Sequence, residues 1–403
     1  MTRKFVLEQP MKNIITYVKE SGSMSFSESP FNQVDSLVFS YLVYYDLRKI
    51  VPPPKEKTCI PLEAAGRQYL RTFGNTQFNV NSALLREMAA SRRFRDVMLS
   101  DFTDVFRIGS AQFAALRAVL PDGTDILTVR GADNTLTSWQ ESFAISYTET
   151  PSQKMALYWM EALVKKYAAE NQMQDIILCG HSKGGNTLLY AAAQCPPELR
   201  RHIRSVYLLD SPGLTPDLYD PAGLAELKGR IIRITPEYSL VGQLFEHQRP
   251  DYIVKCSTEG INQHEPLFWM IEGSSFVPAA ALSPAGRKLA LGVNRWIASA
   301  DFTERETFSR DLFRTLRQAR THGARTVPEP KADRNTEDYE NGHDPAMDPD
   351  GLSEAAGTKK TAAIILQFLL TASGPSRRAA RKLAGAFYVT GLHAFLRKIS
   401  RHH

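Results

Sequence analysis

The spacing of apolar and polar residues divides the chain into a helical first part and a later part that alternates strands with helices. Residues 31–45 carry apolar side chains every three to four positions, as in an amphipathic helix, and the prolines at 52–54 end it. Two or three further helices are expected up to about Leu99. Two apolar runs at 111–120 and 125–130, separated by the turn Pro121-Asp-Gly123, then predict a hairpin.

The second part has the pattern of a buried sheet. A helix is predicted at 153–168, an apolar strand at 175–179 and a small-residue helix at 187–194, followed by strands at 203–209, 230–235 and 252–257. Continuously apolar strands that alternate with helices are typical of parallel sheets covered on both faces. We therefore predict an α/β fold with a mostly parallel central sheet flanked by helices, N-terminal helices and a C-terminal helical extension.

Four regions are expected. Residues 1–100 form a helical region packed on the core, and residues 101–325 form the core itself. Residues 326–358, rich in Pro, Asp, Glu, Asn and Gly, are predicted to be a disordered linker. Residues 359–403 are predicted to form two short basic helices joined at Gly374-Pro375. The second helix either packs back on the domain, which we favour, or contacts a protein partner or an anionic membrane surface through 377–401.

The composition of the chain indicates a cellular compartment but says little more about function. The 403 residues are 43% hydrophobic and 23% charged, with a net charge of +6, and seven Lys/Arg lie between Arg377 and His403 without an acid. This tail lacks interleaved surface aromatic residues and is short for a dedicated module, so no nucleic-acid partner is expected. Four scattered cysteines without a C-x-x-C pair favour the cytoplasm. The N-terminus has no secretory h-region, and the longest apolar run, 362–370, is too short to span a bilayer.

The candidate chemistry centres on Gly180-x-Ser182-x-Gly184, between the strand at 175–179 and the helix at 187–194. This is the pattern of a nucleophile elbow, a sharp turn that exposes a serine hydroxyl and that is too crowded for side chains on either side. Ser182 is therefore the candidate nucleophile. The structural alternative is an ordinary glycine-rich turn between a strand and a helix.

A serine nucleophile needs a base, and three histidines follow the elbow within the predicted core: His202, His247 and His264. His264 follows the last predicted core strand, where an α/β-hydrolase presents its histidine, and we prefer it. His247 is the second choice. His202 lies in a charged helix end and is expected to be solvated.

The acid and the oxyanion hole are less narrowly defined. Asp210 ends one predicted strand and Glu237 follows the next, and either carboxylate would hold the imidazole in the required tautomer; Asp210 is preferred. The expected oxyanion donors are the N–H groups of Lys183 and of Ala132, with Gly131 allowing close approach.

These motifs resemble a known group. Residues 129–133 (V-R-G-A-D), residues 180–186 (G-H-S-K-G-G-N) and Ser211-Pro-Gly213 are similar to the class 3 lipase-like α/β-hydrolases, especially a bacterial lipase-like branch. The resemblance spans residues 31–273 and implies Ser182 as nucleophile, His264 as base and Ala132 as an oxyanion donor. Two positions depart from the pattern: Ala132 replaces Thr or Ser, and residues 239–242 (S-L-V-G) lack the carboxylate of the D-x-V-P motif, so Asp210 and Glu237 both stay open.

The expected function is a serine hydrolase that cleaves small-molecule or lipid carboxylic esters through an acyl-enzyme on Ser182. Thioester or peptide hydrolysis and acyl transfer would use the same residues. Residues 134–153 are expected to form a lid or pocket wall, or else to pack in the core. The alternative function is a catalytically weak scaffold that recruits a partner or membrane surface through its basic C-terminal helices. No zinc, Walker A or dinucleotide motif occurs, so no cofactor is expected.

Overall fold

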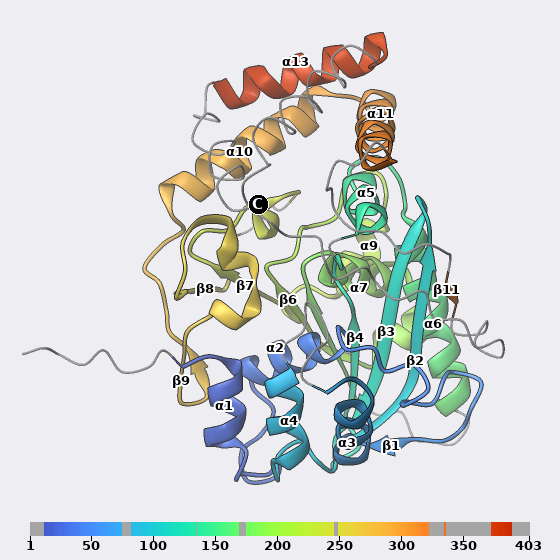
Figure 1. Ribbon diagram of the computed structural model, residues 1–403, viewed down its shortest axis with the longest axis vertical. Helices are drawn as coiled ribbons and strands as arrows, with labels where there is room; N and C mark the ends of the chain where they lie inside the picture. The colour runs from blue at the N-terminus through green and yellow to red at the C-terminus, as the bar shows by residue number, and fades with distance from the viewer. Residues whose placement is uncertain are drawn as a thin grey trace, which may run out of the picture.

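The computed structural model describes residues 12–74, 82–133, 135–168, 175–245, 249–321, 334–335 and 372–388 (Figure 1). Most of its strands lie in one sheet, in the order β1 to β8. These strands are β1 (Ile60–Pro61), β2 (Met98–Arg107), β3 (Ala111–Val119), β4 (Asp125–Val129), β5 (Ile176–His181), β6 (Ile203–Leu209), β7 (Ile231–Pro236) and β8 (Tyr252–Val254). A ninth strand, β11 (Arg334–Asn335), pairs with β2, and β9 (Ile271–Glu272) and β10 (Ser275–Phe276) form a separate hairpin.

Strands β4 to β8 are parallel, whereas β1 to β4 pair antiparallel, with β2, β3 and β4 forming a meander. The hairpin predicted at 111–130 is present as β3 and β4. The predicted strands at 175–179, 203–209, 230–235 and 252–257 correspond to β5, β6, β7 and β8. The α/β fold predicted from the sequence, with a central sheet flanked by helices, is confirmed.

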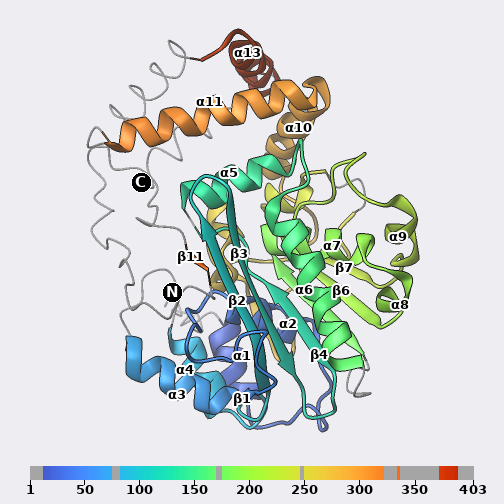
Figure 2. The ribbon, with the colours of Figure 1, turned by 90° about the vertical axis from the view of Figure 1, so that its right-hand side faces the viewer.

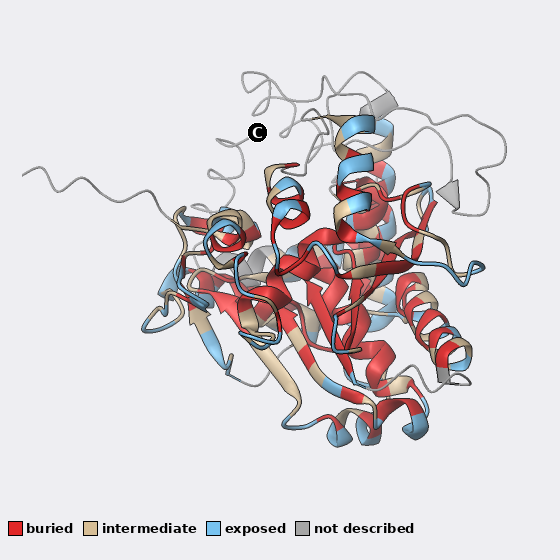
Figure 3. Cartoon of the chain, turned by 90° about the horizontal axis from the view of Figure 1, so that it is seen from below, coloured by how far each residue is buried: buried red, intermediate tan, exposed pale blue. Residues whose placement is uncertain are grey.

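Helices cover both faces of the sheet (Figure 2). One face packs on α1 (Ile14–Ser21), α2 (Gln33–Leu42), α3 (Leu62–Phe73) and α4 (Ser82–Ala90), and the other on α6 (Pro151–Ala168), α7 (Lys183–Gln194), α8 (Pro197–Arg200) and α9 (Pro221–Glu226). In β5, Ile177 faces the first layer and Leu178 the second. Consecutive strand residues point to opposite faces, so a sheet covered on both sides needs continuously apolar strands. Figure 3 shows the resulting burial of the sheet and of the inner helix faces.

A third group of helices lies beyond the carboxyl end of β4, at the top of Figure 1. It consists of α5 (Leu136–Ala144), α10 (Pro284–Ser299), α11 (Phe302–Thr321) and α13 (Gly374–Tyr388). Helix α13 packs on α10 and α11: the Trp296 indole N–H donates to the Ala379 carbonyl at 3.0 Å, and Lys382 pairs with Glu304 at 2.6 Å. Residues 372–388 of the C-terminal region therefore pack back on the protein.

Strand β2 has no counterpart among the predicted elements. Its buried positions include Ser100, Asp101 and Asp104, and its register shifts between Ser100 and Thr103. Buried polar side chains remove the apolar signal of a strand. They are stable here because they are paired, for example Asp104 with the Arg130 guanidinium at 3.1 Å.

Several predictions lie outside the described residues. These are the helix at 359–370, the part of the basic helix beyond Tyr388, and all of the linker at 326–358 except Arg334 and Asn335, which form β11. Within the described ranges, no helix combines the length and the apolar character needed to cross a membrane.

Candidate active site

Ser182 lies at the turn between β5 and α7, in a backbone conformation that non-glycine residues rarely adopt (φ 57°, ψ −134°). The turn is crowded on both sides. A Cβ atom at Gly180 would lie 2.5 Å from the Cα of Gly185, and one at Gly184 would lie 2.0 Å from the carbonyl oxygen of Val129. The glycines of the motif are therefore required by close backbone approach. A strained residue held by its surroundings is common at functional sites, where the strain costs about 1–3 kcal/mol.

Three predicted side chains meet at this turn. The Ser182 hydroxyl lies 2.9 Å from Nε2 of His264, and Nδ1 of His264 lies 2.6 Å from Oδ2 of Asp210. The carboxylate of Asp210 only accepts hydrogen bonds, so Nδ1 carries the proton and Nε2 is free to accept from the serine. The carboxylate is buried, whereas about a quarter of the His264 side chain is exposed. This is the order of groups in a Ser–His–Asp triad.

Asp210 follows β6 directly, also with a positive φ of 44°. Its second oxygen accepts from the Ser239 hydroxyl and from the Gly242 N–H, the latter at 3.0 Å. Residues 239–242, which lack the acid of the D-x-V-P pattern, thus hold a carboxylate supplied by the neighbouring strand. Glu237 makes backbone hydrogen bonds to Val254 and Ser283, and the carboxylate on His264 is that of Asp210.

The segment that carries His264 is a 3₁₀ helix, Gly260–His264, which is followed by another at Pro266–Phe268. The buried Trp269 indole donates to the Gln263 carbonyl at 2.8 Å, and the Gln263 side chain accepts from the Tyr238 N–H at 2.7 Å. These two contacts hold Gln263, the residue before His264, through its carbonyl and through its side chain. His247 lies outside the described residues.

The segments expected to form the oxyanion hole flank the serine. A Cβ atom at Gly131 would lie 3.1 Å from the Cβ of Ser182, so the loop that leads to Ala132 passes directly beside the candidate nucleophile. Lys183 is the first residue of α7, and its N–H has no acceptor within the helix. The positive end of the helix dipole also points at this position. An anion beside Ser182 would be stabilised by these groups.

The side chain of Lys183 has a structural role that the sequence pattern did not indicate. Its ammonium is buried and contacts Glu141 of α5 at 2.6 Å, together with the backbone and side-chain oxygens of Gln112. Glu141 also accepts from the N–H groups of Gln112 and Ser152. The ion pair therefore fastens α5 and the start of α6 to the elbow. Within residues 134–153, α5 also packs through Phe143 on Phe313 of α11, with ring centroids 5.5 Å apart.

Asn186, the last residue of the extended elbow motif, is fully buried. Its side chain donates to the Gly213 carbonyl at 2.7 Å and accepts from the Gln153 amide at 2.9 Å. It thus ties the Ser211-Pro-Gly213 segment and α6 to the nucleophile helix. Asn186 of the elbow motif and Gly213 of the Ser211-Pro-Gly213 motif are therefore in contact.

A second histidine lies against the first. The His181 and His264 rings are 4.5 Å apart and tilted by 33°, and Nε2 of His181 lies 2.8 Å from the His264 carbonyl oxygen. A carbonyl only accepts, so Nε2 carries the proton and Nδ1 accepts from the Tyr44 hydroxyl at 3.2 Å. The Tyr44 oxygen in turn accepts from the Gly131 N–H at 3.1 Å. One directional chain of hydrogen bonds thus joins the Gly131 loop to the His264 loop.

His181 is neutral in this chain. Burial, with a smaller contribution from the neighbouring His264, holds the pKa of His181 well below its usual value. Sequence reasoning did not single out Tyr44 or His181. Tyr44 is one of several aromatic residues in a helical pattern, and nothing local indicates its contact with a residue 137 positions away.

The fold, the strained serine and the Ser–His–Asp arrangement define a protein of the α/β-hydrolase type. Residues 88–314, more than half of the chain, match the model of the Mbeg1-like family. The chain therefore belongs to the Mbeg1-like family, a group of lipase-like proteins of this type. No match was found among curated proteins or among solved structures.

Proposed function

We propose that this protein is a serine hydrolase that cleaves carboxylic esters through an acyl-enzyme on Ser182. The observation that carries the proposal is the continuous hydrogen-bonded order from Ser182 through His264 to Asp210, with the serine held in a strained turn. A hydrogen-bonded base and a third group that orients it are the requirements for activating a serine hydroxyl.

In the first half-reaction, the Ser182 oxygen attacks the ester carbonyl carbon while His264 Nε2 takes the hydroxyl proton. The carbonyl oxygen becomes an oxyanion, which the N–H groups of Lys183 and Ala132 stabilise. His264 then returns its proton to the departing alkoxide, and the alcohol leaves the acyl-enzyme. Asp210 stays ionised and stabilises the imidazolium during both transfers.

In the second half-reaction, His264 removes a proton from a water molecule as the water oxygen attacks the acyl carbon. The tetrahedral intermediate collapses, Ser182 recovers its proton from His264, and the carboxylic acid is released. The substrate is a small-molecule or lipid ester, as expected from the sequence. A cytoplasmic location, inferred from the cysteines, stays a prediction.

The scaffold alternative requires the basic helix to be available for a partner. In the described part of that helix, Arg377 donates to the Ala372 carbonyl and Lys382 pairs with Glu304 of α11. Two of its cationic side chains therefore already have contacts within the chain, which favours the enzyme over the scaffold.

Hydrolysis of p-nitrophenyl esters from acetate to dodecanoate tests the proposal. Wild type should release p-nitrophenol, and Ser182→Ala should lose at least about a thousandfold in kcat/KM, since nucleophile removal in such sites has effects of this size or larger. Ser299→Ala, a matched change at a serine on α10, should retain wild-type activity. Equal rates for Ser182→Ala and wild type would refute the assignment of Ser182.

A further inference from the structure

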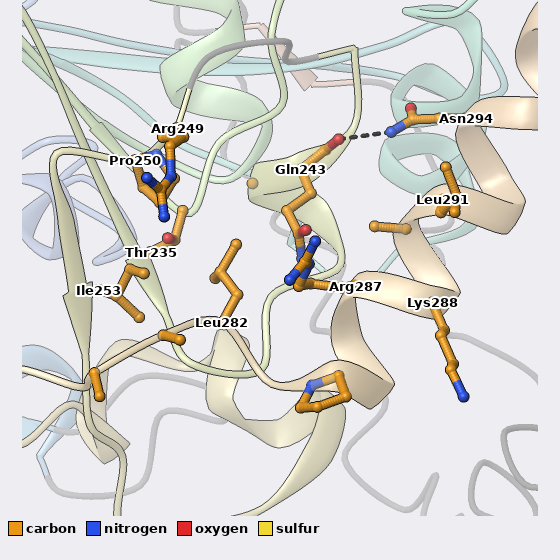
Figure 4. A pocket seen from close by; sticks show the side chains of 15 residues that line it. Thr235, Gln243, Arg249, Pro250, Ile253, Leu282, Arg287, Lys288, Leu291 and Asn294 are labelled. Carbon is orange, nitrogen blue, oxygen red and sulfur yellow. Dashed lines mark hydrogen bonds between the residues drawn. The ribbon is translucent and has the colours of Figure 1, made fainter.

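A cavity of about 890 Å³ lies between β7, β8 and the residues just before β8 on one side and the first turns of α10 on the other (Figure 4). Figure 4 shows Thr235, Arg249 and Ile253 on the strand side and Leu291 and Asn294 on the helix side, with Gln243, Leu282 and Arg287 between them. Its volume is in the range of pockets that hold organic ligands.

The charge of this cavity is one-sided. Arg249, Arg287 and Lys288 line it, and no carboxylate does. Among the described residues, none of the three has an acidic partner. Arg287 and Lys288 also lie in the first two turns of α10, where the helix dipole disfavours cations. An anion in the cavity would reduce both the mutual repulsion of the three cations and the unfavourable interaction of Arg287 and Lys288 with the helix dipole.

The walls of the cavity are largely aliphatic. Ile253 on the strand side, Leu282, and Leu291 on the helix side are among the residues that line it. An apolar chain would fit against these walls.

The cavity adjoins the support of Asp210. Gly242, which lines it, donates its N–H to Oδ1 of Asp210, and Gln243 is fixed by the hydrogen bond from the Asn294 amide to its carbonyl at 2.8 Å. Asp210 uses its other oxygen for His264. The cavity therefore lies behind the carboxylate, separate from the Ser182 hydroxyl.

We propose that this cavity is a second binding site, which takes a single-chain amphiphile with an oxyanion head, either a carboxylate or a phosphate. Arg249 and Arg287 hold the head, and the aliphatic walls hold the chain. Lys288 contributes long-range attraction, because its ammonium points away from both arginines in Figure 4. This site does not depend on the proposed ester hydrolysis.

Calorimetric titration of the full-length Ser182→Ala protein tests the proposal, because this variant separates binding from any turnover. The probes are decanoate, decyl phosphate, decanol and inorganic phosphate. Decanoate and decyl phosphate should each bind at least about tenfold more tightly than decanol or inorganic phosphate, since one lost contact of about 1.4 kcal/mol is tenfold. Equal affinity for decanol would reduce the cavity to an apolar groove, and equal affinity for inorganic phosphate would reduce it to a simple anion site; either result overturns the proposal.

Matched variants locate the binding. Adding Arg249→Gln and Arg287→Gln should weaken decanoate binding by about a hundredfold, at tenfold for each lost charge-assisted contact. Arg295→Gln, on the exposed side of the same helix and outside the cavity lining, should leave affinity unchanged. Unchanged decanoate affinity in the double variant would show that the amphiphile binds elsewhere.

Discussion

The buried contact between Lys183 and Glu141 offers a quantitative test of how the elbow is held. The two charged groups lie 2.6 Å apart with 2% and 0% of their side chains exposed. Glu141→Gln keeps the shape of the side chain but replaces one acceptor oxygen by an NH2 group. Since both Glu141 oxygens accept from backbone N–H groups, of Gln112 and Ser152, the new NH2 must face a donor.

The expected cost follows from this geometry. Breaking a buried ion pair by changing one partner costs about 3–5 kcal/mol, because the other charge stays buried without its partner. Glu141→Gln and Lys183→Met should each destabilise by that amount. The double variant buries neither charge, so its cost should fall short of the sum of the two singles by about 2 kcal/mol or more.

Equilibrium urea unfolding of the four proteins measures these free energies, provided that the slopes agree. Lys12→Met is the control, because Lys12 and Glu20 form a pair of similar length, 2.8 Å, that is 41% and 48% exposed. An exposed pair contributes about 0–1 kcal/mol. The pair would not hold α5 on the elbow if the Lys183 and Glu141 variants lost as little unfolding free energy as Lys12→Met. The same conclusion would follow if the losses of the two single variants simply added in the double variant.

Three further predictions concern the residues around the triad. Ser239→Ala should lower kcat/KM for a p-nitrophenyl ester about tenfold, because Asp210 loses one of its two supporting donors; an unchanged rate would contradict this role. Tyr44→Phe should lower the unfolding free energy by about 1–3 kcal/mol by leaving the Gly131 N–H and His181 Nδ1 unpaired, whereas Tyr69→Phe, whose buried hydroxyl has no partner among the described residues, should not. His181 stays neutral in the folded protein but takes up a proton in the unfolded protein below about pH 6.5, so the unfolding free energy should fall from pH 7 to pH 5 by up to about 1.4 kcal/mol per pH unit. In urea titrations at each pH, the unfolding free energy of His181→Gln should fall less steeply than that of wild type. Equal slopes of unfolding free energy against pH for the two proteins would refute a neutral His181.

The sequence predicts those parts of the fold that local periodicity encodes. The hairpin β3–β4 and the strands β5 and β6 are recognisable because most of their side chains are apolar. Strand β2 is not, because Asp101 and Asp104 are buried in it and their partners lie elsewhere in the chain: Lys166 contacts Asp101 and Arg130 contacts Asp104. The periodicity of apolar residues indicates which face of an element is buried, but it does not indicate which buried charged side chains pair with one another.

The candidate site likewise has a part that the local sequence predicts and a part that depends on long-range contacts. The elbow is a local motif, and chain order and strand ends lead to His264 and Asp210. The sequence favours Asp210 over Glu237, but only three-dimensional contacts show that Ser239 and Gly242 support a carboxylate from the neighbouring strand. Tyr44 and Glu141 look like ordinary helix residues in the sequence, and their contacts with the elbow are long-range.

The most direct test of the central proposal is intact-mass labelling with a fluorophosphonate probe of wild type, Ser182→Ala and His264→Ala. An activated serine should give one adduct on wild type, none on Ser182→Ala, and much slower labelling of His264→Ala, since the imidazole would no longer accept the serine proton. Absence of labelling on folded wild type, or equal labelling of wild type and Ser182→Ala, would contradict the assignment of Ser182 as an activated nucleophile.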